Sequence, residues 1–150
     1  FRYKSKILYE LNRKEIYMQL KLSTDYAIRI VLYLAMREQT VSLDELAEAL
    51  KIEQRYVIKF SKRLQDAGIV FIDDNMQYGF SLAKNPKQIT MFDIINIMES
   101  STKINLCLEE DKFCSRFAVD NCPVRKFYCE LQNNIENSLK SKTIYDLLKT

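Results

Sequence analysis

Four cysteines are the side chains of this sequence best suited to chemistry, and they lie close together in the chain. Six, seven and six residues separate them in turn, at Cys107, Cys114, Cys122 and Cys129. Thiolates are the soft ligands that iron–sulfur clusters need. In a cytosolic protein such a group is more typical of metal ligands, sensors or core residues than of structural disulfides.

Three chemistries are open to this group. Cys107, Cys114 and Cys122 can ligate an iron–sulfur cluster, because an irregular segment between them would let their thiolates converge. The same thiols can instead work without metal, as a redox switch or as inert residues. Zinc is the third alternative, since four cysteines can form a tetrahedral site, but it requires the helix after Cys122 to begin later than Pro123.

A long helix that begins at Pro123 would position these thiols. Proline suits the first position of a helix, and Cys122 would then lie at the positive N-terminus, which favours a thiolate. Cys129 would lie about 10 Å further along, so we expect it to be a small apolar residue of the helix. This helix carries an apolar stripe at Val124, Phe127, Tyr128, Leu131, Ile135 and Leu139. The stripe needs a second helix, and we expect the same helix of a second copy to supply it, giving a homodimer.

A second stretch, residues 42–68, reads as two short helices joined by a tight turn. Ser42 and Glu45 form the sequence pattern of a capping box for the first helix. The second helix is expected over residues 54–67, with Gly68 placed to end it. Apolar residues gather on one side of the second helix, at Tyr56, Val57, Phe60, Leu64 and Ala67.

The opposite side of that second helix is basic. Arg55, Lys59 and Lys62 gather there, with Arg63 at the flank, and residues 51–63 carry five basic side chains against one acidic one. A basic helix held out by a shorter helix is the arrangement of a helix-turn-helix, whose second helix enters the major groove of DNA. We expect Arg55 and Lys59 to contact bases, and Lys62 and Arg63 to contact phosphates.

A small β-hairpin is expected directly after the two helices. Residues 69–72 form a short β-type run, 73–77 a polar turn and 78–82 a second alternating run, as in the wing of a winged helix.

Three further helices are each expected to begin at a capping residue. Their expected caps and extents are Ser23 or Thr24 to about Arg37, Thr90 with Asp93 for residues 91–98, and Thr143 with Asp146 for residues 144–149.

Composition indicates a mainly α-helical protein. Two glycines and two prolines in 150 residues leave little room for loops, and a hydrophobic fraction of 47% is enough for a core. No apolar run is long enough to cross a membrane and no signal peptide is recognisable, so we expect a cytoplasmic protein. The lack of histidine, of a glycine-rich phosphate loop and of a nucleophile beside a base argues against an enzyme.

We divide the chain into four parts. Residues 1–17 are a basic N-terminal extension of unassigned role, and Met18 resembles a natural start. Residues 18–99 form a winged helix-turn-helix DNA-binding domain, and residues 100–122 form a cysteine-bearing loop. Residues 123–150 form a dimerisation helix and a C-terminal helix.

Four features follow one another along residues 18–148. They are the segments LSTDYAIRIVLYLA, VSLDELAEALKIEQRYVIKFSKRLQDAGIV and GFSLAKNPKQITMFDII, and a cysteine cluster before a long helix. Together they resemble the Rrf2 family of bacterial winged-helix transcription regulators. The family includes iron–sulfur-assembly repressors, nitric-oxide sensors and cysteine-metabolism regulators. The resemblance implies a homodimer that binds a pseudo-palindromic operator in double-stranded DNA.

The resemblance also assigns residues to a cluster site, whereas the DNA-contacting residues follow from the helix-turn-helix pattern. It implies that Cys107, Cys114 and Cys122 hold a 2Fe–2S or 4Fe–4S cluster, which purified protein can lack. It further implies that Asp25 of the partner subunit completes the cluster, whereas from the sequence alone Asp25 is a favourable acid in the first turn of a helix. The expected DNA-contacting residues are Gln54, Arg55, Tyr56, Ile58, Lys59, Lys62 and Arg63.

The chain departs from the family pattern in two places. At the wing, Asp74 stands where the family carries an arginine, and only Gly79 remains of several glycines; an aspartate there is repelled by phosphate. Ile58 stands where the iron–sulfur-assembly repressors carry a glutamate, so it can contact a thymine methyl but cannot accept a hydrogen bond from cytosine. The acidic wing keeps a different function open, a winged helix that binds a protein partner and uses its cysteines for a structural metal.

Overall fold

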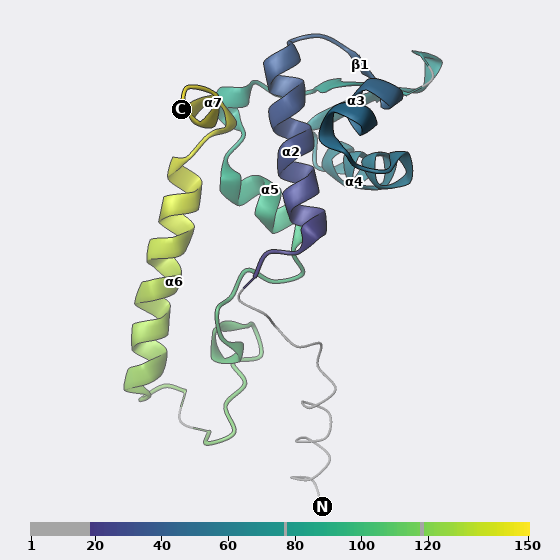
Figure 1. Cartoon of the computed structure of the whole chain (residues 1–150). Coiled ribbons are helices and arrows are strands. Elements are labelled where there is room, and N and C mark those ends of the chain that lie inside the picture. Colours follow the sequence, from purple (N-terminus) through teal and green to yellow (C-terminus); the bar gives the residue numbers. More distant parts are fainter. Residues whose placement is uncertain (1–18, 77, 118) are drawn as a thin grey trace, which may run out of the picture.

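The structure is a computed structural model that describes residues 19–76, 78–117 and 119–150. The extension predicted for residues 1–17 lies outside the described residues. Helices dominate, and a small antiparallel sheet has the strand order β1–β3–β2. Figure 1 shows α2 among the other helices, α6 standing to one side, and the sheet extending away from α6. The fold is a winged helix-turn-helix with a long C-terminal helix, as the sequence predicts.

The predicted helices and hairpin are present to within one or two residues at their ends. In chain order the elements are α2 (Leu22–Arg37), β1 (Val41–Ser42), α3 (Leu43–Leu50), α4 (Gln54–Asp66), β2 (Val70–Asp73), β3 (Gly79–Leu82), α5 (Met91–Met98), α6 (Pro123–Ser141) and α7 (Ile144–Leu148). Short 3-10 turns lie at Asp74–Met76, Pro86–Gln88 and Leu106–Leu108.

Helix α2 is the central element of the core. It contacts α3, α4, α5, α7 and β3, and six of its residues are buried. The prediction that Ser23 or Thr24 caps this helix is wrong, because the helix already begins at Leu22. Thr24 is buried, and its hydroxyl donates a hydrogen bond of 2.5 Å to Glu99 just after α5. A partner from a distant part of the chain thus satisfies the hydroxyl.

Helix α3 begins with only half of the predicted capping box. The Ser42 hydroxyl accepts a hydrogen bond from the backbone N–H of Glu45 at 3.2 Å. The Glu45 carboxylate turns to α2 instead, where it accepts a hydrogen bond from Tyr33 and pairs with Arg37, both at 2.9 Å. Glu45 therefore fixes α3 against α2 and does not complete the cap.

Helix α4 ends in the way that Gly68 predicts. Gly68 has a φ of +74°, and its N–H donates to the carbonyl of Gln65 at 2.8 Å. The N–H of Ile69 donates to the carbonyl of Leu64 at 2.9 Å, which completes a Schellman motif. Ala67, expected on the buried side, is exposed because it is the C-terminal cap.

The wing is a hairpin of β2 and β3, and one further strand joins it. Ile72 pairs with Phe80 across the hairpin. The two residues of β1, Val41 and Ser42, pair with Phe80 and Gly79 on the other edge of β3. Sequence reasoning missed β1, whose two residues are too few to show an alternating pattern.

The capping boxes predicted for α5 and α7 are both formed. The two helix starts lie side by side, because Thr90 forms an isolated antiparallel bridge with Thr143. The N–H of Ile144 donates to the carbonyl of Ile89, and Ile144 is fully buried. The end of the chain is thereby joined to the winged-helix core.

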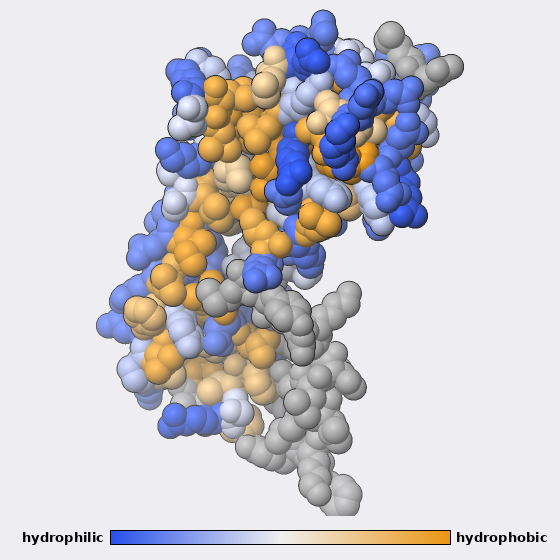
Figure 2. Space-filling view, in the orientation of Figure 1, coloured by the Kyte–Doolittle hydropathy of each residue, from blue (hydrophilic) through white to orange (hydrophobic). Residues whose placement is uncertain are grey.

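Helix α6 is the least buried long element. It contacts α5 and the 3-10 turn at Leu106–Leu108, and Gln132 is its one buried residue. Val124 and Phe127 are 53% and 58% exposed. Figure 2 shows hydrophobic surface continuing from the winged-helix core down along α6 on the side in view. Among the described residues, no helix combines the length and apolar character needed to span a membrane.

Candidate functional site

The outer face of α4 carries two lysines that the rest of the described chain leaves free. Lys59 and Lys62 are directed away from the core, and neither forms a hydrogen bond or ion pair with the residues that the structure describes. The inner face of the same helix buries Val57, Phe60 and Leu64. Burial of the inner face holds the two ammonium groups outward, where they are available to an anionic partner.

Arg55 and Tyr56 form a small cluster at the start of α4. Arg55 pairs with Glu53 at 2.8 Å, and its guanidinium carbon lies 4.7 Å from the centroid of the Tyr56 ring. Tyr56 in turn stacks on Phe60, with 5.8 Å between ring centroids. Gln54 is exposed and donates a hydrogen bond to Asp44 of α3. These contacts fix the first turn of the helix while leaving Arg55 at the surface.

Besides the half-buried Tyr56, two more of the predicted DNA-contacting residues make contacts within the protein in this structure. The guanidinium of Arg63 donates a hydrogen bond of 2.6 Å to the carbonyl of Ile97, near the C-terminus of α5. Ile58 is half-buried and packs against the hydrophobic core. At the wing, Asp74 is exposed in the turn between β2 and β3. The predicted contacts of Arg63 and Ile58 with DNA stay predictions. Lys59 and Lys62 are better placed to contact DNA, because both are exposed on the outer face of α4.

The three cysteines predicted as ligands line one pocket at the N-terminal end of α6. Its volume is about 250 Å³. Arg125 and Tyr128 of α6 also line it, together with apolar residues of the loop, whereas Cys129 does not. Within the described ranges, no three histidine, cysteine, aspartate or glutamate residues lie close enough together to hold a metal ion. The thiols therefore surround the pocket without converging on one point.

Arg125 links two of these cysteines. Its side chain donates a hydrogen bond of 3.0 Å to the carbonyl of Cys107, and its backbone N–H donates to the sulfur of Cys122 at 3.5 Å. Cys122 is the N-terminal cap of α6, as the sequence predicts. Burial raises the pKa of the Cys107 thiol, the Arg125 guanidinium opposes this, and the thiols of Cys122 and Cys129 add to the rise.

Asp25 lies on α2 and is not among the residues that line the thiol pocket of its own chain. It pairs with Arg29 one turn later at 2.7 Å, and its side chain is 46% exposed. This is the role of a first-turn acid that the sequence alone indicates. The contribution of Asp25 to a cluster of a partner subunit stays a prediction.

A polar latch, formed by Gln132 and Glu136, attaches the start of the cysteine loop to α6. The Gln132 amide accepts from the N–H of Ile104 at 2.9 Å and donates to the carbonyl of Thr102 at 3.0 Å. Glu136 pairs with Lys103 at 2.9 Å. Sequence reasoning missed this latch. Its one sequence signal is an amide that lies between apolar positions of the predicted α6 stripe.

Glu99, which directly follows α5 and precedes the latch, makes a similar connection to the start of α2. Its carboxylate accepts hydrogen bonds from the Lys21 N–H at 2.9 Å and from the Thr24 hydroxyl, and it pairs with the Lys21 ammonium at 3.3 Å. Burial raises the pKa of Glu99, but the contacts with Thr24 and Lys21 together outweigh it and lower the pKa below its ordinary value. Glu99 thereby fastens the exit of α5 to the start of α2.

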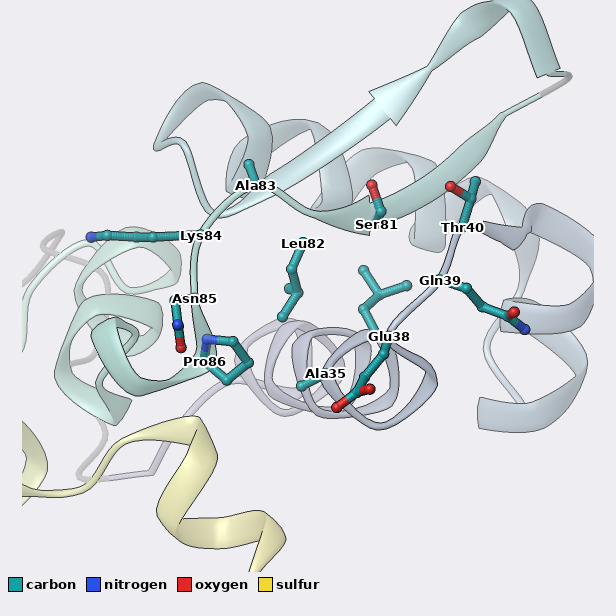
Figure 3. A pocket seen from close by; sticks show the side chains of 11 residues that line it. Ala35, Glu38, Gln39, Thr40, Ser81, Leu82, Ala83, Lys84, Asn85 and Pro86 are labelled. Carbon is teal, nitrogen blue, oxygen red and sulfur yellow. The ribbon is translucent and has the colours of Figure 1, made fainter.

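A larger hollow of about 530 Å³ lies elsewhere, between the end of α2 and the end of β3 (Figure 3). Leu82, Ala35 and Pro86 form its apolar side, and Glu38 and Lys84 lie at its margin. It contains no cysteine and no residue of α4. We therefore place the functional site at the basic face of α4 and at the smaller thiol pocket.

A basic helix exposed from a helix-turn-helix, with an adjacent hairpin wing, defines a DNA-binding protein of the winged-helix class. The profile of the Rrf2 family, described as iron-dependent transcriptional regulators, matches residues 20–150. The chain therefore belongs to the Rrf2 family, whose members are DNA-binding transcription regulators.

Individual relatives agree with this assignment. A protein of Aquifex aeolicus named as an HTH-type transcriptional regulator is 36% identical over 124 residues, which is 82% of this chain and 86% of the relative. The solved structure of T. potens IscR is similar with a TM-score of 0.66 and 26% identity, covering 87% of this chain and 86% of that one. CymR of B. subtilis shares the fold, with a TM-score of 0.69, 22% identity, and coverage of 88% and 97%.

Glu136 makes the stability of the fold depend on acid pH. Hydrogen bonds from Lys103 above all, and from Gln132 and Lys140, lower its pKa to about 2 against the opposing effect of burial. A carboxylate with a lowered pKa stabilises the folded state fully above its ordinary value and loses that effect as the pH falls towards 2. We expect E136Q to lower the free energy of unfolding by about 2 kcal/mol at pH 7 and by much less near pH 2, measured by urea denaturation.

The control for this experiment is E130Q, which changes an exposed carboxylate of the same helix. It should leave the acid dependence almost unchanged. An E136Q chain whose loss of stability is the same at both pH values would show that the carboxylate charge is not what holds the loop.

Proposed function

We propose that this protein is a cytoplasmic, homodimeric transcription regulator that senses redox state, nitric oxide or iron–sulfur status through its cysteine loop. The observation that carries the proposal is the pocket at the start of α6, which three cysteines far apart in the sequence line together. Family membership supports the DNA-binding half of the proposal and favours it over the alternative of a protein-interaction module.

In the proposed complex, α4 enters the major groove of a pseudo-palindromic operator. Lys59 and Lys62 are free of partners in the described chain, so they can neutralise phosphates or approach base edges without breaking a contact. Arg55 can give up its ion pair with Glu53 to hydrogen-bond the edge of a guanine base, because an exposed ion pair is worth at most about 1 kcal/mol. Gln54 and Tyr56 lie on the same first turn and complete the proposed contact surface.

The homodimer is supported by the poor burial of α6. A helix of 19 residues with one buried side chain gains little from packing within its own chain. Val124 and Phe127 expose more than half of their surface, and hydrophobic surface continues along the helix in Figure 2. The same helix of a second copy would cover this stripe and place two α4 helices for two successive major grooves.

The residues of the thiol pocket fit an iron–sulfur cluster in their chemistry, and three cysteines line the same pocket. Cys107, Cys114 and Cys122 would hold it, and Asp25 of the partner subunit is the proposed fourth ligand. The thiols must move together to do so, because in this structure they surround the pocket without converging. The cluster would supply a redox- or nitric-oxide-sensitive group, and this chain would supply thiolates, the positive end of α6 and the Arg125 guanidinium.

A second candidate is a regulator of the same family that senses thiol oxidation or cysteine metabolism without a metal. The separation of the thiols in the present arrangement favours it. Both candidates use the same pocket and the same DNA-binding helix, so they differ only in what the thiols bind.

The salt dependence of DNA binding tests the roles of the two lysines. K62A should reduce the slope of log affinity against log salt by about one on a random-sequence duplex, as expected for the loss of one phosphate contact. K59A should also change which duplexes are enriched from a randomised pool. The control is K126A on α6, and a slope that falls equally for all three variants would contradict the assignment.

The dimer is tested by a charge placed on the exposed stripe. F127D should weaken self-association by about tenfold or more in analytical ultracentrifugation, because a carboxylate would be buried in the proposed interface. N133D, which places the same charge at an exposed polar position of the same helix, should leave the dimer intact. A wild-type chain that is monomeric at micromolar concentration would refute the dimer.

Purification without oxygen decides between the two candidates. A cluster protein should be coloured and contain iron and sulfide, and each of C107S, C114S and C122S should lose most of both. C129S should retain them, because Cys129 does not line the pocket. A colourless, iron-free preparation, also after anaerobic reconstitution with iron and sulfide, would favour the metal-free regulator.

A further inference from the structure

We infer that Gln132 and Glu136 are positioning residues for Cys107, which hold the chain leading to this cysteine on α6. The inference rests on the proposed function of the thiol pocket. It assigns a role to the one buried residue of α6, a polar residue in an apolar stripe. The position of Cys107 would then depend directly on α6.

Gln132 holds the chain through both ends of its amide. Its oxygen accepts from the N–H of Ile104, and its nitrogen donates to the carbonyl of Thr102. Gln132 is 4% exposed, so its own amide has little access to water and depends on these partners, whereas Thr102 and Ile104 are half-buried. One side chain therefore satisfies two backbone groups of an irregular segment and fixes the path of residues 102–104.

Glu136 reinforces the same attachment one turn later. It accepts hydrogen bonds from the Lys103 ammonium and from the Gln132 amide, at 2.9 and 3.0 Å. Its pairing with Lys140, at 3.3 Å, adds a contact within α6. The carboxylate thus orients the Gln132 amide. It also holds Lys103, which lies between the two residues whose backbone groups the amide binds.

The path from the latch to the thiol is short and is anchored again on α6. Asn105 accepts the N–H of Cys107 at 3.2 Å, and the Cys107 carbonyl accepts from Arg125 at 3.0 Å. Arg125 precedes Gln132 by two helical turns, about 10 Å. The chain around Cys107 is consequently attached to α6 at two points, Gln132 and Arg125.

The other end of the segment is tied to the core. Glu99 is bound to Lys21 and Thr24 at the start of α2, and Ser101 donates a hydrogen bond to Glu109. Residues 99–107 therefore bridge α2 and α6. Drawing Cys107 toward the other thiols must act on α6 through the latch and on α2 through Glu99.

Thiol reactivity tests the latch independently of DNA, dimer or cluster. We compare alkylation of reduced, metal-free full-length protein by iodoacetamide, residue by residue and by mass spectrometry, for wild type, Q132A, Q132M and the exposed-amide control N133A. The latch predicts that Cys107 alkylation rises at least roughly fivefold in both Gln132 variants, the factor for losing one of the two backbone hydrogen bonds at ordinary net strength. Cys129 should change little, and N133A should match wild type.

General destabilisation gives a different result. It would raise the alkylation of Cys107, Cys122 and Cys129 together, and this outcome or no change at Cys107 would overturn the inference. Q132M keeps the side-chain volume, so it remains informative if Q132A folds poorly. A double-mutant cycle of K103M and E136Q supplies the second measurement, and additive effects on Cys107 reactivity would also overturn the latch. A chain that shows the latch but neither binds DNA nor holds iron would refute the proposed function alone.

Discussion

The 19 residues of α6 contribute one buried side chain, Gln132. Helices in proteins owe most of their stability to packing of an apolar face, and α6 leaves much of that face uncovered. Its position relative to the core therefore depends on its contact with α5, on polar contacts with the cysteine loop and on whatever covers the stripe around Phe127. The same two features are those proposed to respond to the thiols and to form the dimer. A poorly packed helix is easier to displace than one embedded in the core, which suits a sensor.

Sequence reasoning succeeded where short-range backbone chemistry decides the structure. Gly68 ends α4, Pro123 begins α6, and Thr90 caps α5. Each acts on backbone groups only a few positions away: Gly68 adopts a positive φ, Pro123 lacks the N–H that would be unpaired there, and Thr90 accepts a backbone N–H. The hairpin wing and the outward-facing lysines of α4 follow from periodicity in the same local way. The family resemblance added what local signals cannot supply, namely that the cysteine loop and the winged helix belong to one regulator.

The contacts that the sequence did not predict join residues far apart in the chain. Glu45 had the spacing of a capping box, yet Tyr33 and Arg37 of α2 compete for its carboxylate and hold it. Thr24 was expected to cap a helix that in fact begins before it, because Glu99 meets its hydroxyl 75 residues later. Such partners are set by tertiary packing, so no local pattern encodes them. The latch at Gln132, which we infer to position Cys107, joins distant residues in the same way.

Arginine and lysine have different tasks on α4. Arg63 donates to the carbonyl of Ile97, so it holds α4 against the end of α5. Lys59 and Lys62 have no hydrogen bond or ion pair with the described residues, so they stay free for an anionic partner. Moving Arg63 to a phosphate would break its hydrogen bond to α5, whereas moving Arg55 costs only an exposed ion pair with Glu53. Because α5 runs directly into Glu99 and the cysteine loop, Arg63 connects the proposed DNA-reading helix to the thiol side of the molecule.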